Sequence, residues 1–317
     1  MKIVILDAYT SNPGDLSWAG IEALGDCHIY DRTAEEQVVE RCHDAEAVLT
    51  NKVVISDQTM ARLPKLRYIG VMATGYNIVD VKAAAQRGII VTNVPAYSTA
   101  SVAQIVFAHL LNVANKVQAH SDAVRRGEWT NCKDFTFQVA PTTELAGMQM
   151  GIVGLGQIGS AVARIALAMG MKVAAFTSKS QESLAEGIQK MDIAQLFASS
   201  DVLTLHCPLT ESTREIVNKE RLATMKPTAI VINTGRGPLV NEQDLACALN
   251  SGRIAAACVD VLSQEPPRAD NPLLAARNCF FTPHIAWASQ AARTRLIAVL
   301  ESNLRAYQQG KPQNQVN

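Results

Sequence analysis

The sequence has no excess of charge of either sign, because 29 lysine and arginine residues balance 29 aspartate and glutamate residues. It also has no lysine- or arginine-rich block, so nothing indicates nucleic acid or an anionic membrane as a partner. No apolar run approaches the roughly 20 residues that cross a bilayer. The apolar run at the N-terminus is broken by Asp7 and is too short for a signal peptide. We therefore expect a soluble, cytoplasmic protein.

Paired cysteines are missing as well. The seven cysteines are scattered at positions 27, 42, 132, 207, 247, 258 and 279, and none has C-x-x-C spacing. Their odd number and spacing argue against disulfides and against a zinc site, so we expect reduced thiols and no metal. With 317 residues, of which 48% are apolar and 18% charged, the chain can form two globular domains of ordinary size.

Short apolar segments alternate with helical ones along the whole chain. Strands are expected at Ile3–Leu6, His28–Tyr30, Ala47–Thr50, Tyr68–Val71, Ile89–Thr92, 150–153, Lys172–Phe176, Asp201–Leu205, Ala229–Ile232, Ile254–Val259 and Cys279–Phe281. Such alternation indicates parallel sheets covered by helices on both faces. The predicted fold class is therefore α/β, with two doubly wound, Rossmann-like domains and a cleft between them.

The helical periodicity suggests how the domains are divided. Helices are expected at Asp15–Leu24, from about Ser101 to His120, and at Gln290–Gln309. The last of these is expected to return and cover the first domain. We therefore predict one domain from residues 1–98 plus 290–317, and a second, inserted domain from residues 99–289.

Residues Arg125–Glu144 show no clear period, although they include Trp129, Phe135 and Phe137. Apolar side chains in an irregular, extended segment indicate an arm that packs on a second subunit, which predicts a homodimer. A loop packed on its own domain is the alternative.

The most informative local pattern lies at Met148–Gly170. An apolar strand leads into Gly154-Leu155-Gly156-Gln157-Ile158-Gly159, which is followed by an apolar helix. In a G-x-G-x-x-G turn the glycines allow a tight bend, a close approach to a pyrophosphate, and close packing of helix on strand. A purely structural turn is the alternative, but the order of strand, turn, helix and second strand favours dinucleotide binding.

Three polar residues follow strands of the second domain, where ligands bind in open α/β sheets. They are Arg236, Glu265 and His284. A guanidinium can bind a carboxylate through two hydrogen bonds, and an imidazole exchanges protons near neutral pH. A carboxylate beside the imidazole would favour its cation and fix its orientation. Each residue alone has a structural explanation, but their shared placement in the domain with the glycine turn favours catalysis.

With these motifs the sequence resembles the D-isomer-specific 2-hydroxyacid dehydrogenase family over nearly its whole length. The matching motifs are GLGQIG at 154–159, HCPLTEST at 206–213, NTGRG at 233–237, DVLSQEP at 260–266 and PHIAWAS at 283–289. The resemblance implies hydride transfer between a nicotinamide and a small 2-oxo or 2-hydroxy acid. It also implies that Arg236 holds the substrate, that Glu265 tunes His284, and that His284 passes the proton to or from the oxygen at C2.

Within the family, ATGYN at 73–77 and HIAWA at 284–288 most resemble the glycerate dehydrogenase, or hydroxypyruvate reductase, branch. Two alternatives remain: another small 2-hydroxyacid dehydrogenase, such as a D-lactate-like enzyme, and a dinucleotide-sensing, co-repressor-like binding protein. The short chain and the lack of disordered docking segments argue against the second.

By the same resemblance the first domain binds the substrate and the second binds the dinucleotide. The carboxylate-binding loop of the family matches residues 72–77, where the N–H groups of Thr74 and Gly75 would face the substrate. Asn51 and Lys52 could reach the same carboxylate. Trp287 is expected to wall a small pocket, with plain packing as the alternative.

The implied cofactor contacts spread over several loops. They are Gly154, Gly156, Gln157, Ile158, Gly159, Thr177, Ser178, Lys179, His206, Cys207, Pro208, Thr213, Thr234, Gly235, Arg236, Asp260 and His284. Asp260 is expected on the nicotinamide side. Thr177 stands where an NAD-preferring site usually has an acid, while Lys179 offers a cation. We therefore expect NADP to be favoured over NAD, or both to be used, with a solvated Lys179 as the alternative.

Overall fold

The computed structural model describes residues 1–317, which divide into two compact units. The first unit comprises Met1–Ser98 and Trp287–Asn317, and the second comprises Thr99–Ala286. Each unit is built on a parallel sheet, which confirms the prediction of two α/β domains with parallel sheets. The chain re-enters the first unit at Trp287, whose ring packs edge-on against Tyr97 with centroids 6.3 Å apart.

The first unit holds a five-stranded sheet in the order β2-β1-β3-β4-β5. Its strands are β1 (Lys2–Ile5), β2 (Asp26–Ile29), β3 (Ala47–Thr50), β4 (Tyr68–Val71) and β5 (Ile90–Thr92). Side chains of a strand point alternately to the two faces, so Val4 lies on one face and Ile3 and Ile5 on the other. Both faces are therefore apolar, and each needs a covering layer.

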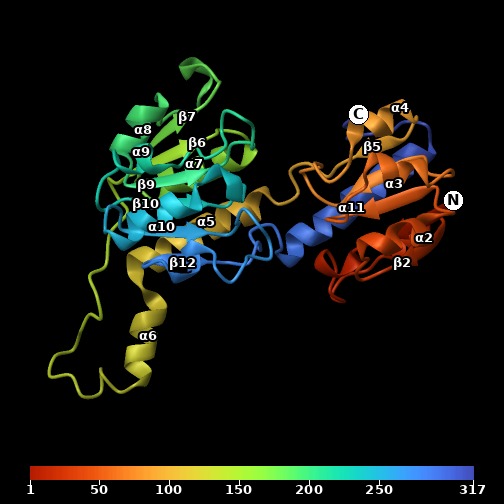
Figure 1. Ribbon diagram of the computed structural model, residues 1–317. Coiled ribbons are helices and arrows are strands. Elements are labelled where there is room, and N and C mark those ends of the chain that lie inside the picture. Colours follow the sequence, from red (N-terminus) through yellow and green to blue (C-terminus); the bar gives the residue numbers. More distant parts are fainter. The chain divides into compact units, whose positions relative to one another are not determined.

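Different helices cover these two faces (Figure 1). Short helices lie over the face of Val4: α2 (Val38–Cys42), α3 (Asp57–Ala61) and α4 (Val81–Gln86). The long C-terminal helix α11 (Gln290–Gln308) covers the other face, where Leu296 and Leu300 belong to the same apolar cluster as Ile3 and Leu49. The first unit is thus assembled from both ends of the chain.

The predicted helix at Asp15–Leu24 is wrong in its extent, since only α1 (Ala19–Glu22) is helical. The Asn12 side chain accepts hydrogen bonds from the N–H groups of Gly14 and Leu16 and donates to the Leu16 carbonyl. Asn side chains that bond nearby backbone in this way compete with a helix. The carboxylate of Asp15 instead forms a two-point contact with the Arg293 guanidinium on α11.

The second unit holds a seven-stranded sheet in the order β12-β11-β10-β9-β6-β7-β8. Its strands are β6 (Gln149–Val153), β7 (Lys172–Phe176), β8 (Ile188–Lys190), β9 (Val202–Leu205), β10 (Ile230–Asn233), β11 (Ala256–Val259) and β12 (Cys279–Phe281). Helices α5 (Thr99–Asn115) and α7 (Gln157–Ala168) pack on one face. Helices α8 (Ile193–Ser199), α9 (Lys219–Leu222) and α10 (Glu242–Asn250) pack on the other. The edge strand β8 was not predicted.

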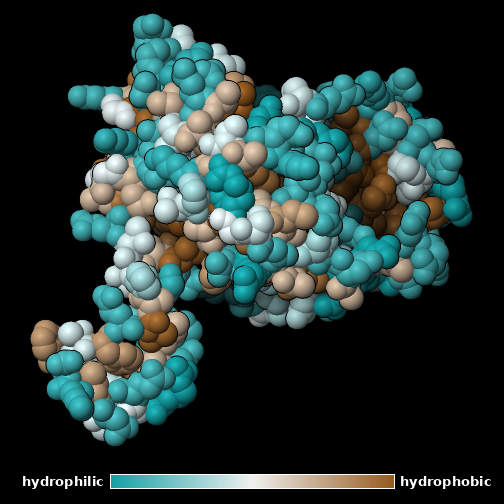
Figure 2. Space-filling model, turned by 60° about the vertical axis from the view of Figure 1, so that its left-hand side comes forward, coloured by the Kyte–Doolittle hydropathy of each residue, from teal (hydrophilic) through white to brown (hydrophobic).

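The single helix predicted at 101–120 is wrong, because the chain forms α5 and then α6 (Val117–Arg125). Lys116 between them has φ +50°, a left-handed conformation that ends a helix. No regular element follows α6 until β6, and this part of the second unit extends away from its sheet (Figure 1). Its apolar side chains are visible in Figure 2, and Trp129 and Phe135 are 51% and 90% exposed.

No helix of the structure combines the length and the apolar character needed to cross a bilayer. No group of three His, Cys, Asp or Glu side chains is placed to share a metal ion.

Candidate active site

All strands of the second unit run parallel, so the loops that follow them leave the sheet at one edge. This edge receives the glycine turn after β6 and the segment at Thr177 after β7. It also receives His206 after β9, Arg236 after β10, Glu265 after β11 and His284 after β12. Ligands of open α/β sheets bind at the carboxyl ends of the strands. The motifs predicted from sequence therefore lie at the edge where a ligand is expected.

The glycine turn has little room for side chains. Gly154 has φ +96°, and a Cβ there would lie 2.6 Å from the backbone nitrogen of Cys207. A Cβ on Gly159 would lie 2.2 Å from the carbonyl oxygen of Gly154. At Gly156, in contrast, a Cβ would meet nothing within 4 Å. The first and last glycines thus close the turn, and the middle one leaves open space beside the backbone.

Helix α7 begins at this turn without a capping side chain, since Gly156 stands at its N-cap. Other helices of the protein have one: Asp192, Asn241 and Ser289 accept N–H groups at the starts of α8, α10 and α11. The first N–H groups of a helix need partners and attract anions. The start of α7, at Gln157 and Ile158, is therefore suited to a phosphate.

A cavity of about 310 Å³ lies beside the turn. Its lining residues are Gly154, Leu155, Gly156, Phe176, Thr177, Ser178, Lys179, His206, Cys207 and Pro208. Burial lowers the pKa of His206 to about 3 and raises the pKa of the Cys207 thiol, so both side chains are neutral near pH 7. No carboxylate lines the cavity, and Lys179 is its cation.

Two hydrogen bonds hold the loop after β7. The Lys179 N–H donates to Thr177 Oγ1 over 3.3 Å, and Lys190 Nζ donates to the Lys179 carbonyl over 2.6 Å. Lys190 lies on the unpredicted strand β8, so sequence reasoning missed this second ammonium group.

Glu265 and His284 are in direct contact. His284 Nδ1 lies 2.5 Å from Glu265 Oε2, and Glu265 Oε1 accepts the Leu262 N–H over 2.9 Å. Because a carboxylate only accepts hydrogen bonds, Nδ1 carries a hydrogen and Nε2 is the nitrogen that can exchange a proton. The pair has the arrangement of a general acid–base with its orienting group.

The backbone of His284 has φ +53°, which non-glycine residues rarely adopt. The His284 N–H donates to the Asp260 carbonyl over 2.8 Å. The buried Asp260 carboxylate accepts the N–H groups of Ile285 and Ala286 over 2.9 and 3.0 Å. Asp260 therefore holds the loop that presents the imidazole. The nicotinamide contact predicted for Asp260 stays a prediction.

Arg236 is exposed at the same edge, and its Nη1 donates to the Gly235 carbonyl. Asn233 shapes this loop, because its side chain accepts from the Gly235 N–H and donates to the Arg236 carbonyl. The neighbouring Thr234 hydroxyl is buried without a hydrogen-bond partner. An unpaired buried hydroxyl costs free energy unless a ligand satisfies it. A bound dinucleotide would account for three features together: the unpaired Thr234 hydroxyl, the uncapped start of α7 and the open space at Gly156.

Thr213 stabilises the loop after β9. Its hydroxyl donates to the Pro208 carbonyl over 2.7 Å and accepts the Thr210 N–H over 2.8 Å. The cofactor contact predicted for Thr213 stays a prediction, and the contacts seen are within the loop.

Hydrogen bonds fix Asn51 and Thr74, two of the residues predicted to bind substrate in the first unit. Asn51 is buried, and its Nδ2 donates to Thr10 Oγ1 over 2.9 Å. Asp7 accepts the N–H groups of Asn51 and Lys52 and so holds this loop, a role that the sequence did not reveal. Thr74 Oγ1 donates to the Val94 carbonyl.

Trp287 packs among the apolar residues of the first unit, beside Tyr97. This contact supports the packing alternative. The predicted wall of a substrate pocket stays a prediction.

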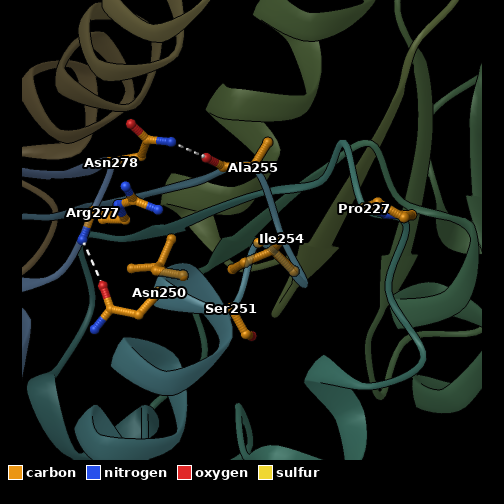
Figure 3. Close-up of a pocket in the computed structure, with 9 residues that line it drawn as sticks. Pro227, Asn250, Ser251, Ile254, Ala255, Arg277 and Asn278 are labelled. Carbon is orange, nitrogen blue, oxygen red and sulfur yellow. Dashed lines mark hydrogen bonds between the residues drawn. The ribbon is translucent and has the colours of Figure 1, made fainter.

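A cavity of about 630 Å³ lies at the opposite end of β10, β11 and β12 (Figure 3). Its lining includes Pro227, Ile254 and Arg277, which precede these strands. The Arg277 N–H donates to Asn250 Oδ1, and Asn278 Nδ2 donates to the Ala255 carbonyl, so these contacts join the loops (Figure 3). Because the predicted motifs lie at the other edge, this cavity is separate from the candidate active site.

The comparisons with known proteins agree with this geometry. The family model described as "D-isomer specific 2-hydroxyacid dehydrogenase, NAD binding domain" matches residues 107–286. Hydroxypyruvate reductase of Blautia hydrogenotrophica is 48% identical over 321 residues, which cover 100% of both chains. Glycerate dehydrogenase of Methylorubrum extorquens is 40% identical over 283 residues, which cover 89% of this chain and 88% of the relative.

The fold is also found among solved structures. An acyclic imino acid reductase in complex with NADPH and D-Arg aligns with a TM-score of 0.87 and 32% identity, over 100% of both chains. The match of family model, full-length relatives and structure leads to one conclusion: the chain belongs to the D-isomer specific 2-hydroxyacid dehydrogenase family and is an oxidoreductase with an NAD-binding domain.

Proposed function

We propose that this protein reduces hydroxypyruvate or glyoxylate to the corresponding 2-hydroxy acid. The observation that carries the proposal is the Glu265–His284 pair at the carboxyl edge of the second sheet. Relatives named hydroxypyruvate reductase, glycerate dehydrogenase and glyoxylate reductase support this substrate class.

Each polar residue of the site has a part in the proposed reaction. Protonated His284 supplies a proton from Nε2 to the oxygen at C2, and Glu265 stabilises the cation through Nδ1. Arg236 binds the substrate carboxylate. A bound reduced nicotinamide supplies the hydride. In the oxidative direction, neutral His284 accepts the proton.

We further propose that Asn51 and the N–H groups of Thr74 and Gly75 contribute to carboxylate binding. Residues 1–98 with 290–317 form the substrate-binding domain of this proposal, and residues 99–289 form the dinucleotide-binding domain.

An absorbance assay of the reduced nicotinamide with a panel of 2-oxo acids tests the reaction directly. We expect hydroxypyruvate and glyoxylate to be reduced with higher kcat/KM than pyruvate. Binding of NADPH without reduction of any 2-oxo acid would contradict the proposal and favour a dinucleotide-sensing protein.

Replacing Arg236 by lysine tests the role given to the guanidinium. Lysine keeps the charge but cannot form two parallel hydrogen bonds with a carboxylate. Charge-assisted hydrogen bonds contribute about 1.5–3 kcal/mol, so we expect kcat/KM for hydroxypyruvate to fall about 10- to 100-fold. Steady-state kinetics measure this change. Arg277→Lys, in the cavity at the opposite end of the strands, is the matched control. If both variants had the same kinetics, Arg236 would not be part of the substrate-binding site.

We propose that NADPH is preferred to NADH. The support is the cavity that contains Thr177, Ser178 and Lys179 and has no carboxylate in its lining. Lys190 adds a second ammonium group beside the same loop. A 2′-phosphate carries about two negative charges, which ammonium and hydroxyl groups can bind.

We also propose a homodimer formed through the arm predicted from the sequence, residues Arg125–Glu144. Phe135 is 90% exposed, and Trp129 Nε1 donates to the Phe135 carbonyl over 3.0 Å, so a hydrogen bond joins the two aromatic residues. Exposed apolar side chains on an extended segment are typical of interfaces.

Phe135→Asp is expected to convert the dimer to a monomer at micromolar concentration, because each dimer loses two buried aromatic rings. Sedimentation velocity measures the change. Leu274→Asp is the control, since Leu274 is an exposed apolar residue of the same unit outside the arm. A monomeric unmodified protein, or an unchanged dimer in the Phe135 variant, would contradict the proposal.

The cytoplasm is the location that we propose. All seven cysteines are free. Unpaired cysteines are typical of proteins in reducing compartments such as the cytoplasm.

A further inference from the structure

His109 lies in the middle of α5 and belongs to none of the motifs that identify the family. Its side chain is buried, and its Nε2 lies 3.0 Å from Thr282 Oγ1, although 173 residues separate the two in sequence. Thr282 directly follows β12 and stands two positions before His284. A residue of α5 therefore contacts the segment that carries the proposed catalytic imidazole.

The direction of each hydrogen bond follows from the groups involved. Thr282 Oγ1 donates to Asp260 Oδ1 over 2.5 Å. A hydroxyl has only one hydrogen, so Thr282 must accept the hydrogen bond that comes from His109 Nε2. Burial lowers the pKa of His109, against the opposing effect of the Asp260 charge, and this favours a neutral ring with a single N–H. The contact with Thr282 places that hydrogen on Nε2.

The chain of contacts ends on the backbone around His284. The same Asp260 carboxylate accepts the N–H groups of Ile285 and Ala286, and the Asp260 carbonyl accepts that of His284. His284 itself has φ +53°, a conformation that persists only where surrounding contacts impose it. The orientation of Asp260 therefore determines how the loop is held.

Packing alone does not account for an imidazole at position 109. A cavity of about 270 Å³ adjoins it, lined by Ile105, Ala108, Asn112, Phe280 and Phe281 together with His109 and Thr282. In such mainly apolar surroundings a leucine would pack without the cost of burying a polar ring. The imidazole contributes a hydrogen-bond donor instead.

We propose that His109 is a positioning residue for His284, acting through the Thr282 hydroxyl and the Asp260 carboxylate. The catalytic part of this inference rests on the proposed function, because it requires His284 to transfer the proton. Without the donor at position 109, the Thr282 hydroxyl can turn away from Asp260. The carboxylate then holds the 282–286 loop less firmly.

Two variants of His109 separate this role from simple packing. His109→Leu keeps the volume and removes the donor, whereas His109→Gln keeps an N–H that can reach Thr282. We expect His109→Leu to lower kcat about tenfold with KM and NADPH affinity within about twofold, because misplacement of a catalytic group affects the chemical step. His109→Gln should retain at least about half of kcat. Equal decreases of kcat in the two variants would overturn the proposal. An increase in KM with unchanged kcat would overturn it as well.

Hydrogen exchange of the peptide spanning residues 282–288 gives a readout that needs no substrate. The amides of Ile285 and Ala286 should exchange about tenfold faster in His109→Leu than in the unmodified protein, and at nearly the original rate in His109→Gln. Unchanged exchange in His109→Leu would overturn the proposal, as would faster exchange with unchanged kcat. If the unmodified protein reduced no 2-oxo acid, the proposed function would fail, while the exchange rates would still decide whether His109 positions the loop.

Thr282 provides an independent check by a double-mutant cycle. Thr282→Val removes the hydroxyl and Thr282→Ser keeps it. The effects of His109→Leu and Thr282→Val on kcat should be far from additive, because both break the same chain of contacts. Additive effects would show that the two residues act separately and would overturn the proposal.

Discussion

His284→Ala is expected to lower kcat for the reduction of hydroxypyruvate by about 10²- to 10⁴-fold, which is the usual contribution of general acid catalysis. The imidazole is oriented by Glu265 over 2.5 Å, so its Nε2 is the group that can protonate the substrate oxygen. The affinity for NADPH should change by less than about twofold, because the predicted phosphate contacts lie at the glycine turn. Steady-state kinetics and fluorescence titration of NADPH measure the two quantities.

The control for this substitution is His43→Ala, since His43 is an exposed histidine of the first unit. Its kinetics should match those of the unmodified protein. If His284→Ala retained half of the original kcat, the role given to His284 would be wrong. If NADPH affinity fell as steeply as kcat, the imidazole would belong to cofactor binding.

Thr177→Asp is expected to reverse the cofactor preference, with a change of about 10²- to 10³-fold in the ratio of kcat/KM for NADPH to that for NADH. The cavity that contains Thr177 has no carboxylate in its lining and contains Lys179. A new carboxylate there would repel a 2′-phosphate, and juxtaposed like charges cost several kcal/mol. In NADH the same carboxylate can accept hydrogen bonds from the ribose hydroxyls.

Both cofactors must be compared at one modest ionic strength, because salt screens exposed charges. Thr224→Asp adds the same charge at an exposed site of the second unit and should leave the ratio unchanged. A tenfold preference of the unmodified protein for NADH would contradict the proposal. Thr177 and Ser178 would then bind the ribose hydroxyls, with Lys179 in solvent.

The sheets were predictable because their strands are buried on both faces. β3, β4 and β10 are mostly apolar and are buried at every position, which gives a strong signal in the sequence. β8 has only three residues, of which Ile188 alone is buried, so it leaves no pattern.

The helix break at Lys116 was missed for a different reason. Lysine is a good helix former, and its left-handed conformation is imposed by the fold.

The proposed catalytic pair was predictable from its place in the sequence, after two predicted strands. Glu265 and His284 follow neighbouring parallel strands, so the rule for strand ends places them together. His109 could not be identified, because it lies in an apolar helix, where periodicity indicates only a core position. Asp7 was equally hidden, since it interrupts an apolar run and its contacts with Asn51 and Lys52 join residues far apart in sequence.

The way the first unit is assembled has a consequence for the growing chain on the ribosome. The second unit is continuous in sequence, so it can fold as soon as residue 286 has emerged. The first unit waits for α11, whose Leu296 and Leu300 belong to the apolar cluster of Ile3 and Leu49, and for Val316 and Asn317, which bond the backbone of Val91. During synthesis, one face of the first sheet therefore stays open to chaperones and proteases until translation of the remaining residues closes it.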